Sequence, residues 1–323
     1  MTTLALEPIL GHEGTSLSTE LVDRAADYAR VSKATSTVVT YGYAWRGFVR
    51  WCRTRGVAAL PADPTTVATY LADEAGRLKV ATLELRIVSI AEAHRLAGLD
   101  SPTKDPRVVA VLKGVRRTHG KARTKKKPLS VLDLKSVLST LGDDLQGRRD
   151  AAMLLLTYGA ALRRSEVVGL DVGDIEFHPD GLIVNVRRSK TDQEGTGHRV
   201  GVGYGSSPET CPVVALRKWL AATGLTNGPL FRAIDRHGKI RRGRLRPRAV
   251  ARIIQNLGDR VGLDPKKLGG HSLRAGFATA AARAGLSERE IARTTRHKSM
   301  AVLRGYIHEG EMFAAESTRR IGL

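Results

Sequence analysis

A small set of residues in this chain has the types and the order needed to break a phosphodiester bond. The set comprises Arg163, His271, Arg274, His297 and Tyr306. A phosphodiester under attack places extra negative charge on its non-bridging oxygens, and the planar guanidinium of arginine binds such oxygens through two parallel hydrogen bonds. A tyrosine hydroxyl can attack phosphorus if a neighbouring base, such as histidine, accepts its proton. The set therefore indicates transfer of a phosphoryl group to tyrosine.

Two further residues could support this chemistry. Glu166 follows Arg163 by three positions at the expected end of a buried helix over 149–162, so the two should share a helix face. Lys190 ends the first strand of an expected hairpin, where it could protonate the leaving 5′-oxygen. Taken singly, each feature has an ordinary alternative: a helical salt bridge, a surface lysine, or a tyrosine that packs near a C-terminus. The combined pattern is what favours a catalytic site.

The chain is strongly basic. Its 323 residues carry a net charge of +21, with a pI of about 10.5 and 42% hydrophobic residues. This length suffices for two domains, and such a charge favours a polyanionic partner, above all nucleic acid, over a merely solvated surface. The two cysteines, Cys52 and Cys211, have neither zinc nor disulfide spacing. We find no apolar run long enough to cross a membrane and no signal peptide, so a cytoplasmic location is expected.

The first third of the chain reads as a helical domain. After a flexible tail over 1–16, helical periodicity begins at 17 and continues in segments near 36–53, 64–75, 80–96 and 108–116. Asp63 followed by Pro64 predicts a capped helix start. Residues 116–127 contain seven Lys or Arg and no acid, which predicts an extended linker. We therefore expect an all-α domain over 17–116, a basic linker over 117–128 and a second domain over 129–323.

The second domain reads as mostly helical with a small antiparallel sheet. Alternating residues over 182–188 and a returning segment over 198–202 predict a hairpin. Capping boxes are expected at Ser130 with Asp133, and at Ser287 with Glu290. Residues 232–252 contain nine Lys or Arg and one acid, and a helix is expected over 248–262.

The stretches Leu162-Arg163-Arg164-Ser165-Glu166, His271-Ser272-Leu273-Arg274 and Arg296-His297-Lys298-Ser299, with Tyr306 beyond, resemble the catalytic motifs of the tyrosine recombinases, the phage integrase family. The resemblance covers roughly residues 20–315 and is to simple, Cre-like site-specific recombinases. One departure is Arg296, where many relatives have glycine. The fold that it implies is an all-α, SAM-like core-binding domain followed by an α+β, mostly helical catalytic domain.

The resemblance also implies a function and an assembly. Arg163, Glu166, Lys190, His271, Arg274, His297 and Tyr306 match the catalytic set, and a 3′-phosphotyrosyl intermediate stores the bond energy, so no cofactor or metal is expected. The partners would be duplex DNA with inverted-repeat half-sites and further copies of this chain, forming a tetramer that works through a Holliday junction. Residues 308–323 resemble the C-terminal helix that docks into a neighbouring subunit. Residues expected to contact DNA are Thr82, Arg86, Arg123, Lys125, Lys126, Lys127, Arg244, Arg246 and Arg248.

Two other functions remain open on the sequence. A type IB topoisomerase uses a similar pocket but relaxes DNA as a monomer. A DNA-binding protein that has lost catalysis would keep the charge but not the complete set of catalytic residues.

Overall fold

The computed structural model describes residues 32–120, 126–187, 197–297 and 299–312, together with isolated positions between 18 and 28. The chain forms two compact units, 1–124 and 125–323, and each is described by itself. The expected tail over 1–16 lies outside the described residues, and so does most of the helix expected to begin at 17.

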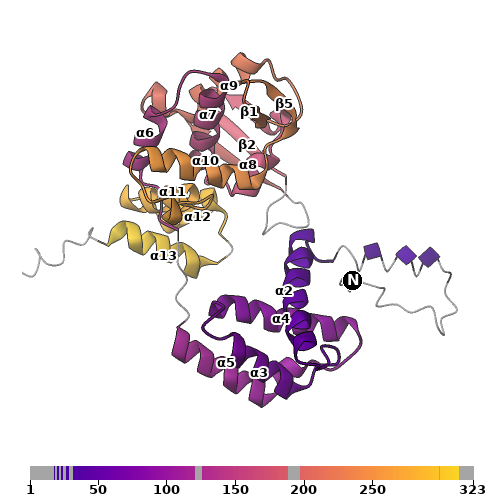
Figure 1. Ribbon diagram of the computed structural model, residues 1–323. Coiled ribbons are helices and arrows are strands. Elements are labelled where there is room, and N and C mark those ends of the chain that lie inside the picture. The colour runs from indigo at the N-terminus through magenta and orange to yellow at the C-terminus, as the bar shows by residue number, and fades with distance from the viewer. Residues whose placement is uncertain are drawn as a thin grey trace, which may run out of the picture. The chain divides into compact units, whose positions relative to one another are not determined.

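The N-terminal unit is helical throughout its described part. It contains α2 (Thr35–Thr54), α3 (Pro64–Glu74), α4 (Val80–Leu96), a 3-10 turn (Pro102–Lys104) and α5 (Pro106–His119). Helix α2 packs on α4, and α3 packs on α5 (Figure 1). The Asp63 side chain accepts a hydrogen bond from the Thr65 amide, which confirms the predicted cap. The core of this unit is centred on Phe48, which stacks with Trp51 and meets Tyr70 edge-on.

Helix α5 extends three residues into the range expected for the linker. Its last turn carries Arg116, Arg117 and His119, and Gly120 ends the helix with φ of +69°. Cations in the last turn of a helix interact favourably with its negative end. Arg116 also forms an ion pair with Glu84 of α4 at 2.8 Å. These interactions explain why a run of basic residues remains helical here instead of extending at 117.

The C-terminal unit is mostly helical. Its helices are α6 (Val131–Ser139), α7 (Leu145–Gly159), α8 (Arg164–Gly169), α9 (Pro212–Thr223), α10 (Pro247–Arg260), α11 (Ser272–Arg283), α12 (Glu288–Thr295) and α13 (Met300–Glu311). Short 3-10 turns occupy Val172–Asp174, Pro208–Thr210 and Pro265–Lys267. The capping boxes predicted at the starts of α6 and α12 are both formed. No helix of the described residues is long and apolar enough to span a bilayer.

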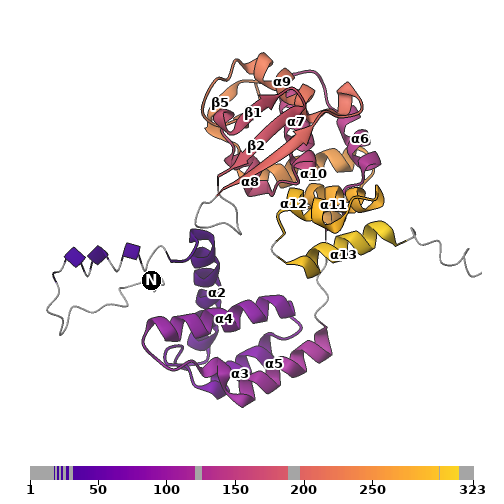
Figure 2. The ribbon, with the colours of Figure 1, turned by 180° about the vertical axis from the view of Figure 1, so that it is seen from behind.

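A three-stranded antiparallel sheet covers one side of this unit, in the order β1 (Ile175–His178), β2 (Gly181–Val186) and β3 (His198–Gly203). The hairpin of β2 and β3 was predicted, whereas β1 was not. Leu182, Val184 and Val186 of β2 are buried. The sheet lies in front of α7 and α10 in Figure 2 and behind them in Figure 1. A second hairpin, β4 (Arg232–Ile234) with β5 (Ile240–Arg244), was also missed.

Helix α7 is the central element of the unit. It runs through a core that joins it to α6, α9, α10 and the sheet, and most of its last ten residues are buried. Helix α11 contacts α7, and the chain entering the unit crosses α11 at Gly276. A Cβ atom at Gly276 would lie 2.0 Å from the Leu129 carbonyl oxygen, so only glycine permits this crossing. Helices α7 and α11 therefore pack closely beside the chain that enters this unit.

Candidate active site

The turn between α7 and α8 places the first arginine. Helix α7 ends at Gly159, and Ala161 takes a left-handed conformation with φ of +46°. Arg163 therefore does not lie at the end of the buried helix, as the sequence suggested. It is the residue before α8, and Glu166 occupies the third position of that short helix. The two residues therefore form a capping box at the start of α8 rather than a pair along a helix face.

Glu166 is the buried acid of this cluster, with a side chain only 1% exposed. One carboxylate oxygen accepts from the Arg163 guanidinium at 2.6 Å, and the other accepts from the Arg163 backbone amide at 2.9 Å and from Arg296 at 2.8 Å. Burial by itself raises the pKa of Glu166, but Arg296 and Arg163 outweigh it and hold this pKa below its usual range. The carboxylate is therefore charged at neutral pH.

Arg274 lies in the first turn of α11 and is 1% exposed. One of its terminal nitrogens donates to the Ala161 carbonyl at 2.7 Å, whereas the other has no hydrogen-bond partner among the described residues. Burial, together with the nearby Arg163 and Arg296, lowers the pKa of Arg274 to about 9. The guanidinium still carries its charge at pH 7. An anion bound here would supply the hydrogen-bond acceptor that its buried nitrogen lacks.

His271 and Tyr306 meet directly. His271 stands just before α11, and its Nε2 lies 2.8 Å from the hydroxyl oxygen of Tyr306, which projects from α13. Burial raises the pKa of Tyr306, while Arg274 opposes this rise. Partial burial and then Arg274 and Arg163 lower the pKa of His271, although its ring keeps contact with solvent. A neutral phenol therefore faces a neutral imidazole that could accept its proton.

His297 is a second histidine beside the tyrosine. Its ring centroid is 6.0 Å from that of Tyr306, and its Nδ1 lies 2.8 Å from the hydroxyl of Thr295 at the end of α12. Burial and then Arg274 lower the pKa of His297 to about 4. This histidine is thus uncharged at neutral pH and can donate or accept a hydrogen bond at its free nitrogen.

The structure brings Arg163, Glu166, His271, Arg274, His297 and Tyr306 together in one cluster. Lys190 belongs to the connection between β2 and β3 and lies outside the described residues. The sequence had singled out Arg296 only as a departure from the usual glycine. Its left-handed backbone, with φ of +54°, explains the glycine of relatives, but its contact with Glu166 gave no sequence signal.

Two of the expected DNA contacts form hydrogen bonds within the protein. Arg86 donates to the carbonyls of Tyr43 and Ala44 in α2, where Gly47 leaves room for the guanidinium. Arg244 donates to the Val168 and Leu170 carbonyls at 2.8 and 3.0 Å. Both side chains link neighbouring elements of the protein, Arg244 is nevertheless exposed, and the roles of both residues in binding DNA stay predictions.

The remaining expected DNA contacts are placed differently. Arg246 and Arg248 are exposed where α10 begins. Thr82 is half-buried in the first turn of α4. Lys126 and Lys127 run beside the turn before α11, with the Lys127 amide donating to the Lys267 carbonyl at 2.8 Å. Arg123 and Lys125 lie outside the described residues.

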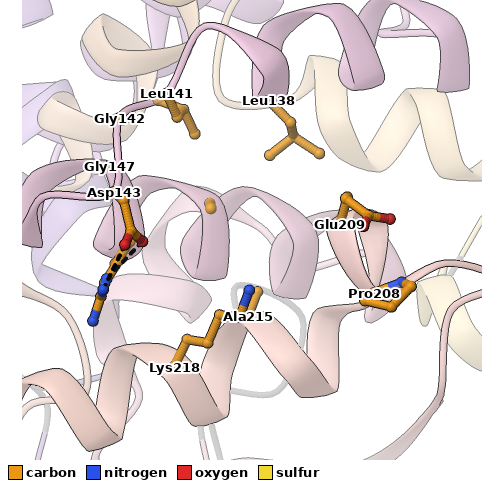
Figure 3. Close-up of a pocket in the computed structure, with 11 residues that line it drawn as sticks. Leu138, Leu141, Gly142, Asp143, Gly147, Pro208, Glu209, Ala215 and Lys218 are labelled. Atoms are coloured by element: carbon orange, nitrogen blue, oxygen red, sulfur yellow. Dashed lines mark hydrogen bonds and ion pairs between the residues drawn. The ribbon is translucent and has the colours of Figure 1, made fainter.

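Other cavities share no residue with this cluster. Figure 3 shows a small pocket of about 140 Å³ between the start of α7 and α9, where Asp143 forms an ion pair with Arg148. A larger groove of about 410 Å³ lies along α11 and is lined by Leu129, Val131, Gly276, Thr279, Ala280 and Ala284, among others. Among the described residues, no group of three or more His, Cys, Asp or Glu side chains could hold a metal ion.

Comparison with known proteins agrees with this geometry. Residues 129–312 match the model of the phage integrase family. An integrase/recombinase XerD homolog of Selenomonas ruminantium is 37% identical over 295 residues, covering 90% of this chain and 86% of the relative. The recombinase Cre of Escherichia phage P1 is 26% identical, covering 81% and 80% of the two chains.

A solved structure shares the fold. It is the XerH site-specific recombinase bound to a palindromic difH substrate in a post-cleavage complex, with a TM-score of 0.66 and 18% identity over 93% of this chain and 82% of that one. Together with the cluster around Tyr306, these findings establish that the chain belongs to the phage integrase family. It is a DNA recombinase of the tyrosine class.

Proposed function

We propose that this recombinase cuts and rejoins duplex DNA at specific sites through a covalent bond between Tyr306 and a 3′-phosphate. The observation that carries the proposal is the 2.8 Å contact between Tyr306 and His271 beside the unpartnered nitrogen of Arg274. A nucleophile, a base and an anion-binding donor thus lie next to one another. Their residue types match what attack on a phosphodiester requires.

The proposed reaction begins with attack of the Tyr306 oxygen on phosphorus. As the new bond forms, the tyrosine proton passes to Nε2 of His271, and the bond from phosphorus to the 5′-oxygen breaks. Arg163 and Arg274 bind the non-bridging oxygens, whose charge increases in the transition state. His297 donates a further hydrogen bond there, and Lys190 protonates the departing 5′-oxygen.

The same steps run backwards with a different 5′-hydroxyl. Attack of the 5′-hydroxyl of a partner duplex on the phosphotyrosyl bond releases Tyr306 and joins the two strands. Reciprocal exchange of one strand from each duplex produces a Holliday junction, and exchange of the second pair of strands resolves it. Because the phosphotyrosyl ester keeps the energy of the broken bond, the exchange needs no nucleotide hydrolysis.

The proposed assembly is a tetramer on two DNA sites that each contain inverted-repeat half-sites. Each protomer would hold DNA with an N-terminal core-binding domain (the described helices α2–α5), the basic linker and the start of α10. The groove along α11, with its small and apolar lining, would receive the C-terminal segment of a neighbouring subunit. That segment is expected over residues 308–323, of which 308–311 form the end of α13 and 313–323 lie outside the described residues.

The nucleophile can be tested on DNA that the protein itself selects. Duplexes chosen from a randomised pool by binding to this protein are rebuilt with a nick, which traps the covalent product. The wild-type chain should form a protein–DNA adduct, and Tyr306→Phe should bind the same duplexes equally well without forming one. An adduct with the Phe variant would assign the nucleophile to another tyrosine.

A plasmid assay separates recombination from relaxation. Supercoiled plasmids with one or two copies of the selected site are incubated with the protein. A recombinase yields deletion or inversion products only with two copies, whereas a type IB topoisomerase relaxes both plasmids as a monomer. A chain that binds the site without changing either plasmid would be a catalytically silent DNA-binding protein.

A further inference from the structure

We propose that Arg296 is a positioning residue of the active site: it completes the ion pair of Glu166 and ties the turn that carries Arg163 to the loop that carries His297. This inference rests on the proposed cleavage reaction and adds a residue to it. Arg296 stands directly before His297, at the end of α12.

The side chain of Arg296 joins two parts of the chain. It is 5% exposed, and one terminal nitrogen donates to Glu166 at 2.8 Å. The other terminal nitrogen donates to the Ala160 carbonyl at 3.1 Å and to the Thr294 carbonyl at 2.9 Å. The planar fork of arginine is suited to such a bridge because its donors are held in fixed directions. The turn after α7 and the end of α12 are thereby fastened to each other.

The backbone of Arg296 shows that this side chain is needed. Its left-handed conformation, with φ of +54°, disfavours any residue with a Cβ, by about 1–3 kcal/mol. Glycine would take this conformation without strain. The contacts of the buried guanidinium must offset that cost.

Arg296 and Arg163 share the carboxylate of Glu166, and this sharing explains how Arg296 helps to position Arg163. Arg296 occupies one carboxylate oxygen from the buried side, while Arg163 occupies the other with a side chain that is 19% exposed. Arg163 is thus oriented by the carboxylate but does not have to neutralise it alone. Both terminal nitrogens of Arg296 are bonded to protein groups, whereas its buried Nε has no hydrogen-bond partner among the described residues. We assign Arg296 a positioning role because its two terminal nitrogens hold Glu166 and two backbone carbonyls.

The test is a comparison of cleavage rates in single turnover on the nicked, selected duplex, at DNA concentrations that saturate each protein. Arg296→Gln should cleave about 10- to 100-fold more slowly, since displacement of a catalytic group by about 1 Å can cost as much. Its affinity for DNA should be unchanged. Arg293→Gln removes the same charge from an exposed position of α12 and should cleave at the wild-type rate.

The pH dependence separates positioning from a general structural defect. Without Arg296, the buried Glu166 has lost its main cationic partner and should gain a proton at higher pH. As the pH is lowered, Arg296→Gln should therefore lose activity at a higher pH than the wild type does. Arg296→Lys keeps the charge and should lose activity at the same pH as the wild type. The double variant Arg296→Gln, Glu166→Gln restores the net charge of the cluster and should lose less activity than the two single variants combined.

Arg296→Gly guards against misfolding, because glycine suits the left-handed backbone while removing the same contacts. The proposal is wrong if Arg296→Gly and Arg296→Gln both cleave at the wild-type rate. It is also wrong if the two effects in the double variant are simply additive and the acidic side of the pH–rate profile does not change. If instead the wild-type chain itself forms no adduct, the proposed reaction fails, and the defect is not one of Arg296.

Discussion

Replacement of Arg274 by methionine should make the DNA-free protein more stable and nearly inactive. Methionine preserves much of the buried volume but removes the charge. A pKa of about 9 in place of 12.5 means that the folded protein disfavours the charged side chain by on the order of 5 kcal/mol, at about 1.4 kcal/mol per unit. Losing the charged hydrogen bond to the Ala161 carbonyl costs about 1.5–3 kcal/mol in the other direction. The free energy of unfolding should therefore rise by roughly 2–3.5 kcal/mol.

The same change should cut the cleavage rate. The unpartnered nitrogen of Arg274 is the donor that we assign to a non-bridging oxygen, and removal of one preorganised donor slows such reactions by about 10²- to 10³-fold. The opposite signs of the two effects distinguish a functional arginine from a structural one. A structural arginine would lower stability and activity together when removed.

The measurement is chemical denaturation of the C-terminal unit within the full chain, alongside single-turnover cleavage of the nicked duplex. Arg289→Met is a matched control, because Arg289 is exposed in the first turn of α12. It should change neither quantity appreciably. If Arg274→Met is less stable than the wild type, or cleaves at the wild-type rate, Arg274 is not a phosphate-binding donor whose buried charge lowers the stability of the DNA-free protein.

Three further predictions concern proton transfer and DNA reading. Lys190→Ala should cleave normal DNA very slowly but recover on a substrate whose 5′-bridging oxygen is replaced by sulfur, because sulfur leaves without a proton donor. Arg163→Ala should cleave both substrates slowly. Equal defects of Lys190→Ala on the two substrates would exclude Lys190 as the acid. Arg248→Ala should lose about 1–3 kcal/mol of binding free energy for the target and relax the preference at one base pair of each half-site, as measured by selection from random duplexes. An equal loss of affinity for all sequences would indicate that Arg248 contacts a phosphate. Because the pKa of His271 is lowered from 6.5, cleavage at subsaturating DNA should be lost only as the pH falls below 6.5, and an acid limb at or above that value would argue against His271 as the base.

Local signals in the sequence predicted much of the fold. Asp63 with Pro64, and the capping boxes at Ser130 and Ser287, identified helix starts that the structure has. Such caps act through neighbouring residues, so they can be recognised from short stretches of sequence alone. Strand β5 was missed because Ile240-Arg241-Arg242-Gly243-Arg244 has almost no apolar residue, and its pairing with β4 is not visible in its own composition.

The cluster around Tyr306 was predicted as a set of residue types, but its geometry was not. The destination of a long side chain depends on elements distant in the sequence. Nothing in the local sequence around Arg86 and Arg244 shows that backbone carbonyls distant in the sequence hold each of these side chains. For the same reason Arg296 could be recognised only as an exception to a glycine, and not as the partner of Glu166.

The hydrophobic cores of the two units have no residue in common: that of the N-terminal unit surrounds Phe48, and those of the C-terminal unit surround α7 and join α11 to α12 and α13. Each unit therefore has what it needs to fold by its own burial of apolar surface, and the chain between them is basic and short. This division makes the protein suitable for module exchange. A chimaera that takes residues 1–120 from a relative and keeps the C-terminal unit would leave the cores of both units intact. Engineering of a new DNA target could then begin from whole-unit replacement instead of single substitutions.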